Sequence, residues 1–222
     1  MTEDEFVAEL MEAPDAKLII DRVQIALNTE SQRRHEFYEW LRDDVKAEFI
    51  NGEVIMHSPV FRRHLRASKW LFRLLMDYVE INDLGEVDIE KALVTLTRND
   101  YEPDICFWRK EIADTFNDET MQHPAPDLVV EILSKSTANR DRGIKYEDYA
   151  AHGVLEYWLV DPRRKLVEQY KLDEEFMAFE IVGSSKITDT ITAITVPGFT
   201  IPVRAMFEQE ANRAALGVLL TT

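Results

Sequence analysis

The 222-residue sequence has a single cysteine, Cys106, and no long uninterrupted apolar run. One cysteine excludes an intrachain disulfide framework and a multi-cysteine zinc cluster. No apolar run approaches the roughly 20 residues that a membrane-spanning helix needs. The first residues, Met-Thr-Glu-Asp-Glu-Phe, are acidic and lack the basic-then-apolar layout of a signal peptide. These absences favour a protein of the reducing cytoplasm with no membrane partner.

Positive charge is also scarce. Lys and Arg total 26 against 42 Asp and Glu, which gives a formal net charge of −16. Nucleic-acid binding depends on lysines and arginines that neutralise phosphates, so this charge counts against attraction over the whole surface. A local basic groove on an acidic body remains open. The composition, 45% hydrophobic and 31% charged, is that of an ordinary soluble globular protein.

The sequence has no internal repeat or convincing linker, and its length suits one large domain with or without a small appendage. Residues 1 to about 30 are predicted to be helical, with a break at Pro14. The remaining pattern predicts an α/β core around a mixed sheet. Helices are predicted at 37–41, 62–79, 110–118, 140–152 and 205–220; strands at 87–97, 105–108, 128–133, 155–160, 166–170 and 176–182; and irregular β structure over 191–203.

A β-hairpin is predicted around Asn51-Gly52, because this dipeptide is the strongest short-range hairpin signal. A two-residue turn sets Ile50 opposite Glu53 and Glu48 opposite Ile55. Opposed residues share a face, so Glu48 and Glu53 are predicted to point the same way.

The helix at 62–79 is predicted to be amphipathic. An apolar arc of Leu65, Phe72, Leu75, Met76 and Val79 is its predicted core side, with His64 at the margin. Basic residues spaced along another face could contact a phosphate backbone, together with Lys135, Arg140 and Arg142, although a solvated helix face is an equally good interpretation. This basic stripe comprises Arg62, Arg66, Lys69 and Arg73.

Two acids stand in apolar, strand-like surroundings. Glu131 is the one carboxylate in Leu128–Leu133, on the same predicted face as Val129 and Leu133. Asp104 follows Pro103 directly before another apolar run. Singly, Glu131 could lie on a solvated face and Asp104 could be a turn residue. Together, at the ends of neighbouring strands, they would form an oxygen-rich site suited to Mg²⁺ or Mn²⁺.

Lys145 lies on the side of its predicted helix that also carries Ile144 and Tyr149. A lysine facing its own sheet can extend toward the strand ends and meet Glu131. The alternative is an exposed lysine paired with Asp141 or Asp148.

The order of several motifs resembles the Uma2 family, also called DUF820, a group of uncharacterised, mostly bacterial proteins in the PD-(D/E)XK nuclease superfamily. The resemblance covers roughly residues 35 to 203. It rests on Glu-Phe-Ile-Asn-Gly-Glu (48–53), a helix opening with His64, Pro103-Asp104, Pro126-Asp-Leu-Val-Val-Glu-Ile-Leu-Ser134, Ser136-Thr137, Asp141, Lys145, Tyr149, Gly153-Val154 and Glu156-Tyr-Trp-Leu-Val-Asp-Pro162.

The resemblance implies a restriction-endonuclease-like fold, with a central mixed β-sheet flanked by helices. It matches Asp104 and Glu131 to the two metal-binding acids, which would hold Mg²⁺ or Mn²⁺. Leu133 occupies the usual lysine position, and Lys145 on the following helix is the predicted substitute. Glu48 matches an additional acid of the site. Glu53 is a weaker candidate, and His64 matches a frequent histidine to which no role is assigned.

The predicted function is a metal-dependent endodeoxyribonuclease that hydrolyses phosphodiester bonds. The alternative is a nuclease-fold module with a binding or regulatory role and little or no cleavage, which the net charge of −16 favours. RNA or branched DNA is a further open substrate class. We expect an N-terminal extension (1–34), a nuclease-fold domain (35–204) and a terminal helix (205–222) that is a candidate homodimer contact.

Overall fold

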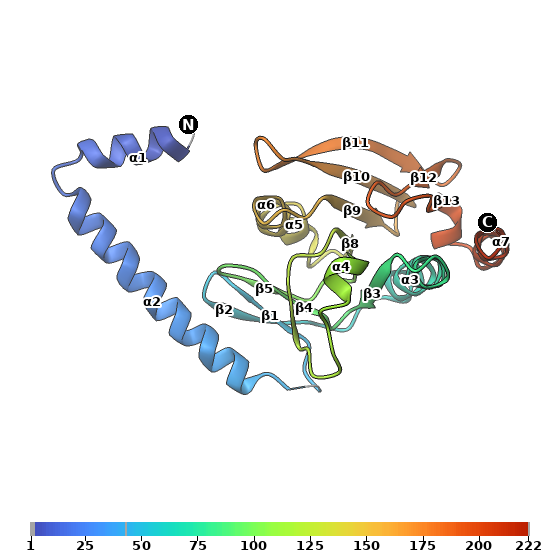
Figure 1. The fold of residues 1–222 in the computed structure, drawn as a ribbon, viewed down its shortest axis with the longest axis horizontal. Coiled ribbons are helices and arrows are strands. Elements are labelled where there is room, and N and C mark those ends of the chain that lie inside the picture. The colour runs from blue at the N-terminus through green and yellow to red at the C-terminus, as the bar shows by residue number, and fades with distance from the viewer. Residues whose placement is uncertain (1–2, 43, 222) are drawn as a thin grey trace.

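A six-stranded mixed sheet forms the centre of the protein in the computed structural model, which describes residues 3–42 and 44–221 (Figure 1). Its strands run in the order β11-β10-β9-β8-β6-β3, with β8 and β9 parallel and the other neighbours antiparallel. The strands are β3 (Gly85–Ile89), β6 (Ile105–Arg109), β8 (Leu128–Ile132), β9 (Glu156–Asp161), β10 (Leu166–Asp173) and β11 (Ala178–Lys186).

Alternation along the strands divides the core into two layers. Leu128, Val130 and Ile132 pack on the side of helices α3 (Arg62–Ile81) and α7 (Gln209–Leu219). Val129 and Leu133 pack on the opposite side, against α6 (Ile144–Ala151). Because successive strand residues point to opposite faces, Glu131 belongs to the α6 side, as predicted. A short pair, β12 (Thr190–Thr192) and β13 (Thr200–Pro202), and a 3₁₀ turn (Val203–Met206) complete the first layer.

A second sheet, in the order β2-β1-β5-β4-β7, lies on the α6 side and begins with the predicted hairpin. Ile50 pairs with Glu53 and Glu48 with Ile55. Both turn residues, Asn51 and Gly52, have positive φ (50° and 81°), which suits a tight hairpin turn. The strands are β1 (Ala47–Ile50), β2 (Glu53–Met56), β4 (Leu93–Thr95), β5 (Asp100–Tyr101) and β7 (Gln122–His123).

Two helices, α1 (Glu3–Glu12) and α2 (Ala16–Trp40), form an arm to one side of the body (Figure 1). The chain breaks between them near Pro14, as expected, but the predicted short helix at 37–41 is the end of the 25-residue α2. The second half of α2 contacts the body: Phe37 packs on Phe49, and Arg34 and Glu30 form ion pairs with Asp100 and Arg98. The arm is therefore attached through β1, β5 and the turn before β5.

Three further sequence predictions are corrected. The run 87–97 is two strands in different sheets, because the chain turns at Glu90, which has φ of 66°. The helix predicted over 140–152 is α5 (Ala138–Asp141) followed by α6, interrupted at Gly143. A Cβ at Gly143 would lie 2.9 Å from the Asn139 carbonyl oxygen, so this interruption requires glycine. Leu65, predicted to face the core, is 47% exposed, because His64, Ala67 and Ser68 form the buried side of these turns of α3.

The remaining elements match the predicted positions with shifted ends. The helix predicted near 110–118 is the short α4 (Lys110–Ala113), and the terminal helix begins at Gln209. No helix within residues 3–42 and 44–221 is long and apolar enough to cross a membrane.

Candidate active site

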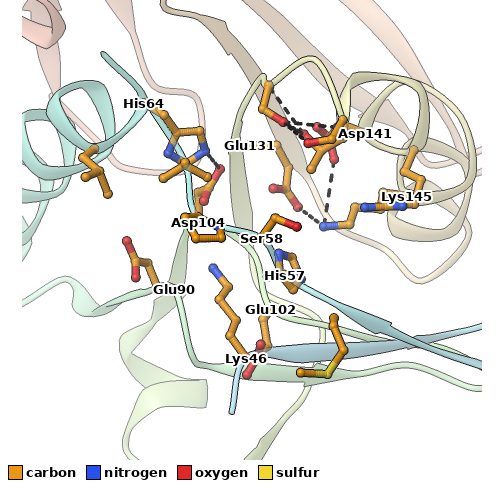
Figure 2. A pocket seen from close by; sticks show the side chains of 18 residues that line it. Lys46, His57, Ser58, His64, Glu90, Glu102, Asp104, Glu131, Asp141 and Lys145 are labelled. Atoms are coloured by element: carbon orange, nitrogen blue, oxygen red, sulfur yellow. Dashed lines mark hydrogen bonds and ion pairs between the residues drawn. The ribbon is translucent and has the colours of Figure 1, made fainter. Parts of the chain in front are cut away.

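A pocket of about 500 Å³ opens between the β1–β2 hairpin, the beginning of α3, and the loop and helices that follow β8 (Figure 2). It brings together Asp104, Glu131 and Lys145, although Glu131 lies 27 residues after Asp104 and 14 residues before Lys145 in the sequence. The other lining residues are Lys46, Met56, His57, Ser58, Pro59, Val60, His64, Leu65, Glu90, Glu102, Ser134, Ser136, Thr137, Arg140 and Asp141.

Lys145 lies at the inner wall, 3% exposed, and connects two acids from different sheets. Its Nζ is 2.8 Å from Oε1 of Glu131 and 2.6 Å from Oε1 of Glu48. Oδ1 of Asp141, one helical turn earlier, is 4.0 Å away. The prediction that Lys145 reaches Glu131 from its helix is therefore confirmed as geometry, and the exposed alternative is wrong.

One carboxylate oxygen of Asp104 contacts two groups of the protein. Its Oδ2 accepts a hydrogen bond from the backbone N–H of Ile132 at 2.7 Å and lies 3.2 Å from Nε2 of His64. The first contact ties Asp104 to the strand that carries Glu131. The second gives His64 a structural contact that the sequence left unassigned.

Asp141 differs from these acids because both of its carboxylate oxygens are buried without a hydrogen-bond partner. Glu48 Oε2 and Glu102 Oε2 are also buried without a hydrogen bond, although His57 Nε2 lies 3.4 Å from the former. A buried oxygen without a donor costs free energy. The acids near the pocket are thus incompletely satisfied by the protein.

The pKa values reflect one lysine shared among several acids. Burial would raise the pKa of Glu48, but Lys145 and His57 outweigh it and lower that pKa to about 2. Burial raises the pKa of Glu131 well above its usual range, against Lys145 and with help from Asp141 and Asp104. Burial likewise raises the pKa of Asp141 to about 6. The cluster holds more negative charge than Lys145 neutralises.

Lys145 and Asp104 stay charged at neutral pH. Burial would lower the pKa of Lys145, but Glu131, Glu48 and Asp141 raise it well above its ordinary value. Burial would raise the pKa of Asp104, but the hydrogen bond and charge of His64 lower it. A permanently protonated lysine cannot act as a general base, so its part in chemistry is electrostatic.

The donor set fits a hard divalent cation. In Asp104 both contacts fall on Oδ2, and in Glu131 the contacts of Lys145 and Tyr149 both fall on Oε1. Each acid therefore keeps one oxygen without a hydrogen bond or ion pair to any described residue. No group of three or more His, Cys, Asp or Glu side chains in the described chain forms a ready metal cage. Mg²⁺ is commonly bound through one or two carboxylates with several waters, which this pair allows.

A second hollow of about 430 Å³ lies next to this pocket and shares Leu65 and Glu90 with it. Three members of the predicted basic stripe, Arg62, Arg66 and Lys69, line the hollow. The other phosphate-contact candidates separate into two kinds. Arg73 bonds Asn212 and Arg142 pairs with Glu168, whereas Lys135 is exposed and Arg140 lines the pocket.

The predicted site residues differ in part from the residues that line the pocket. Glu53 shares the hairpin with Glu48 but is exposed and does not line the pocket. Lys46 and His57 line the pocket and were not predicted. A signal for both was present: Lys46 is two residues before Glu48 on the same strand face, and the hairpin register sets His57 opposite Lys46.

Comparisons with known proteins agree with the fold and the motifs. The Uma2 family model, described as "Putative restriction endonuclease", matches residues 34–204. An uncharacterized Synechocystis protein, sll1609, is 30% identical over 146 residues, which are 63% of this chain and 81% of that protein.

Among solved structures, a nuclease of DUF820 from Anabaena variabilis, described as "putative", superposes with a TM-score of 0.66 at 17% identity, over 82% of this chain and 97% of that chain. The type IIG restriction endonuclease BpuSI aligns with a TM-score of 0.34 at 15% identity, over 71% of this chain and 16% of that chain. The fold is restriction-endonuclease-like, and since the family model covers most of the sequence, the chain belongs to the Uma2 family.

Proposed function

We propose that this protein is a metal-dependent endonuclease that hydrolyses phosphodiester bonds in DNA. The observation that carries the proposal is the pair of carboxylates in one pocket, Asp104 and Glu131, each with one oxygen that forms no hydrogen bond or ion pair with the residues that the structure describes. Membership of a family described as "Putative restriction endonuclease" supports the same reaction class.

Asp104 and Glu131 would hold the cation, Mg²⁺ or Mn²⁺. When bound, the cation would supply an activated water and neutralise charge on the phosphoryl group. The protein's own part is to hold both acids in register: Ile132 N–H and His64 fix Asp104, and Lys145 fixes Glu131. Lys145 and Glu48 would act electrostatically, because Lys145 keeps its proton beside three acids and Glu48 keeps its charge beside Lys145.

A duplex could reach this pocket despite the net charge of −16, because positive charge is concentrated beside it. Arg62, Arg66 and Lys69 line the adjoining hollow on exposed positions of α3. Phosphate contacts of this kind position a nucleic acid without reading its sequence. The acidic remainder of the surface would limit non-specific binding elsewhere.

One observation favours a second function, a nuclease-fold module that binds nucleic acid without cleaving it. Within residues 3–42 and 44–221 no third acid joins Asp104 and Glu131 in a complete metal cage, and Lys145 is already neutralised by Glu48 and Glu131. A site of this kind could keep its shape while turning over slowly.

The deciding experiment is cleavage of plasmid and oligonucleotide DNA with Mg²⁺ or Mn²⁺ by wild type, Asp104→Ala and Glu131→Ala. Calorimetric titration with each metal runs in parallel. We expect cleavage in wild type alone and a loss of metal binding in both variants. Equal cleavage by all three proteins would refute the assigned site. Metal binding that depends on both acids, without cleavage by wild type, would instead favour the module that does not cleave.

A further inference from the structure

The pocket contains two lysines in opposite situations. Lys145 is buried and contacts Glu48 and Glu131 at 2.6 and 2.8 Å. Lys46 is half-buried, lines the same pocket, and has no ion pair or side-chain hydrogen bond to the residues that the structure describes. In Figure 2 its ammonium points into the pocket toward Asp104.

We propose that Lys46 is the residue that contacts the scissile phosphate of the substrate. The inference rests on the proposed function and adds to it a substrate-binding residue. In this assignment Lys145 binds the carboxylates of Glu48 and Glu131, and Lys46 binds the phosphate of the substrate.

The hairpin places Lys46 where this contact requires it. Lys46 directly precedes β1, and alternation gives it the same face as Glu48, while Ala47 and Phe49 face α2. The N–H of His57 donates to the Lys46 carbonyl oxygen at 3.2 Å, which continues the β1–β2 ladder by one pair. The backbone of Lys46 is therefore fixed, and its side chain is the part left free.

The charges around Lys46 explain why it is available. Asp104 is nearby, but its Oδ2 is already occupied by His64 and the Ile132 N–H. Glu102 lines the same pocket. Neither acid lies within ion-pair distance of Lys46. A phosphate that enters the pocket meets several carboxylates, and a free ammonium at its mouth offsets their repulsion.

The competing interpretation is that Lys46 only balances the charge of Asp104 and Glu102 inside the folded protein. The two readings differ in salt dependence. A lysine that binds phosphate releases counterions from DNA, so its removal lowers the slope of log K against log salt by about 1. A lysine with only an internal role leaves that slope unchanged.

The experiment compares wild type with Lys46→Met, Lys46→Arg and Lys186→Met. Lys186 is exposed at the end of β11, outside the pocket, and its replacement removes the same charge. Binding of a fluorescent DNA duplex is measured by anisotropy with Ca²⁺ over a series of salt concentrations. Single-turnover cleavage is measured with Mg²⁺, and urea unfolding checks that each variant folds.

For Lys46→Met we expect a slope smaller by about 1 and a cleavage rate roughly 100-fold lower. Lys46→Arg should restore the slope, and Lys186→Met should match wild type. Wild-type slope and rate in Lys46→Met, or the same losses in Lys186→Met, would overturn the assignment. If wild type binds DNA without cleaving it, hydrolysis fails as the proposed function, and the slope alone decides for or against Lys46. A wild type that does not bind DNA refutes both.

Discussion

Two buried glutamates lie at opposite ends of the adjacent parallel strands β8 and β9, and their carboxylates have different hydrogen-bond partners. Glu156, at the start of β9, forms no ion pair with a described residue and accepts five hydrogen bonds. The donors are the Trp158 indole, the Gln169 amide, the backbone N–H groups of Ile194 and Thr195, and the Thr195 hydroxyl. Glu131 near the end of β8 has Lys145 and the Tyr149 hydroxyl, both on one oxygen.

The same division holds for the other buried acids. Both carboxylate oxygens of Asp100 accept hydrogen bonds, from Arg34 and Tyr38. Both oxygens of Asp127 contact Arg109, one through its backbone N–H and one through its guanidinium. In contrast, Asp141 has two buried oxygens without a hydrogen bond, and Glu48 and Glu102 have one each. Each of these structural carboxylates has donors for both oxygens. Each of the carboxylates around the pocket has at least one oxygen without a hydrogen bond, and this deficit distinguishes a site from a structural network.

The largest expected effect on stability is at Glu156. Glu156→Gln places an amide nitrogen against donors and leaves several without an acceptor, which should cost about 4 kcal/mol of unfolding free energy. Glu131→Gln should cost less than about 1 kcal/mol, because Lys145 keeps Glu48 and the pKa of Glu131 is already raised. Urea unfolding at pH 7 measures both. Equal losses would remove the distinction between the two acids.

Glu48 should resemble the structural acids in stability. Its pKa is lowered to about 2, so it stabilises the fold above the unfolded pKa, near 4.5, and this stabilisation fades as the pH falls toward 2. Glu48→Gln should therefore cost about 3 kcal/mol at pH 7 and less than half of that at pH 3. Unfolding of both proteins across this range tests the difference. A cost independent of pH would mean that Glu48 acts through packing alone.

Asp141 should behave in the opposite way. Its pKa is raised from 3.8 to about 6, so the folded state binds the proton more tightly and the acid destabilises the fold as the pH rises through this window. Relative to wild type, Asp141→Asn should gain up to about 3 kcal/mol between pH 4 and pH 7. Chemical unfolding at the two pH values provides the measurement. A relative loss over the same interval would contradict the direction of the shift.

Divalent metal should give the smallest change. At a Mg²⁺ concentration about ten times its Kd, binding should stabilise wild type by about 1.4 kcal/mol, or a few degrees in Tm. Asp104→Asn should lose this increment, and Glu156→Gln should keep it despite its lower starting Tm. Thermal unfolding with Mg²⁺ and with EDTA checks all three proteins. An increment retained in Asp104→Asn would place the metal elsewhere.

Much of this contrast is local, and local features are what the sequence predicts well. Alternation along 128–133 puts Glu131 on the α6 side, and the helical position of Lys145 brings it within reach. The Asn51-Gly52 turn fixes which residues face each other across the hairpin.

What the sequence could not supply is how distant segments pack. Glu48 meets Lys145 across 97 positions only because the second sheet lies on the α6 side of the first. The exposed position of Leu65 and the length of α2 likewise depend on where neighbouring elements end. Three expectations stay predictions: the domain division at residue 34, the cytoplasmic location and the homodimer. The first of these places a boundary within α2.

The turn at Asn51-Gly52 has a consequence for how this family can tolerate insertions. Because β1 is also paired with β5, an extra residue in this two-residue turn would shift β2 against β1 by one position and set Met56 in place of His57 opposite Lys46. Such an insertion would thus exchange a histidine beside Glu48 for an apolar side chain, whereas a longer loop between β10 and β11 would leave the pocket unchanged. The length of this turn therefore affects the electrostatics of the pocket, although it lies more than 40 residues before Asp104, the first of the proposed metal ligands.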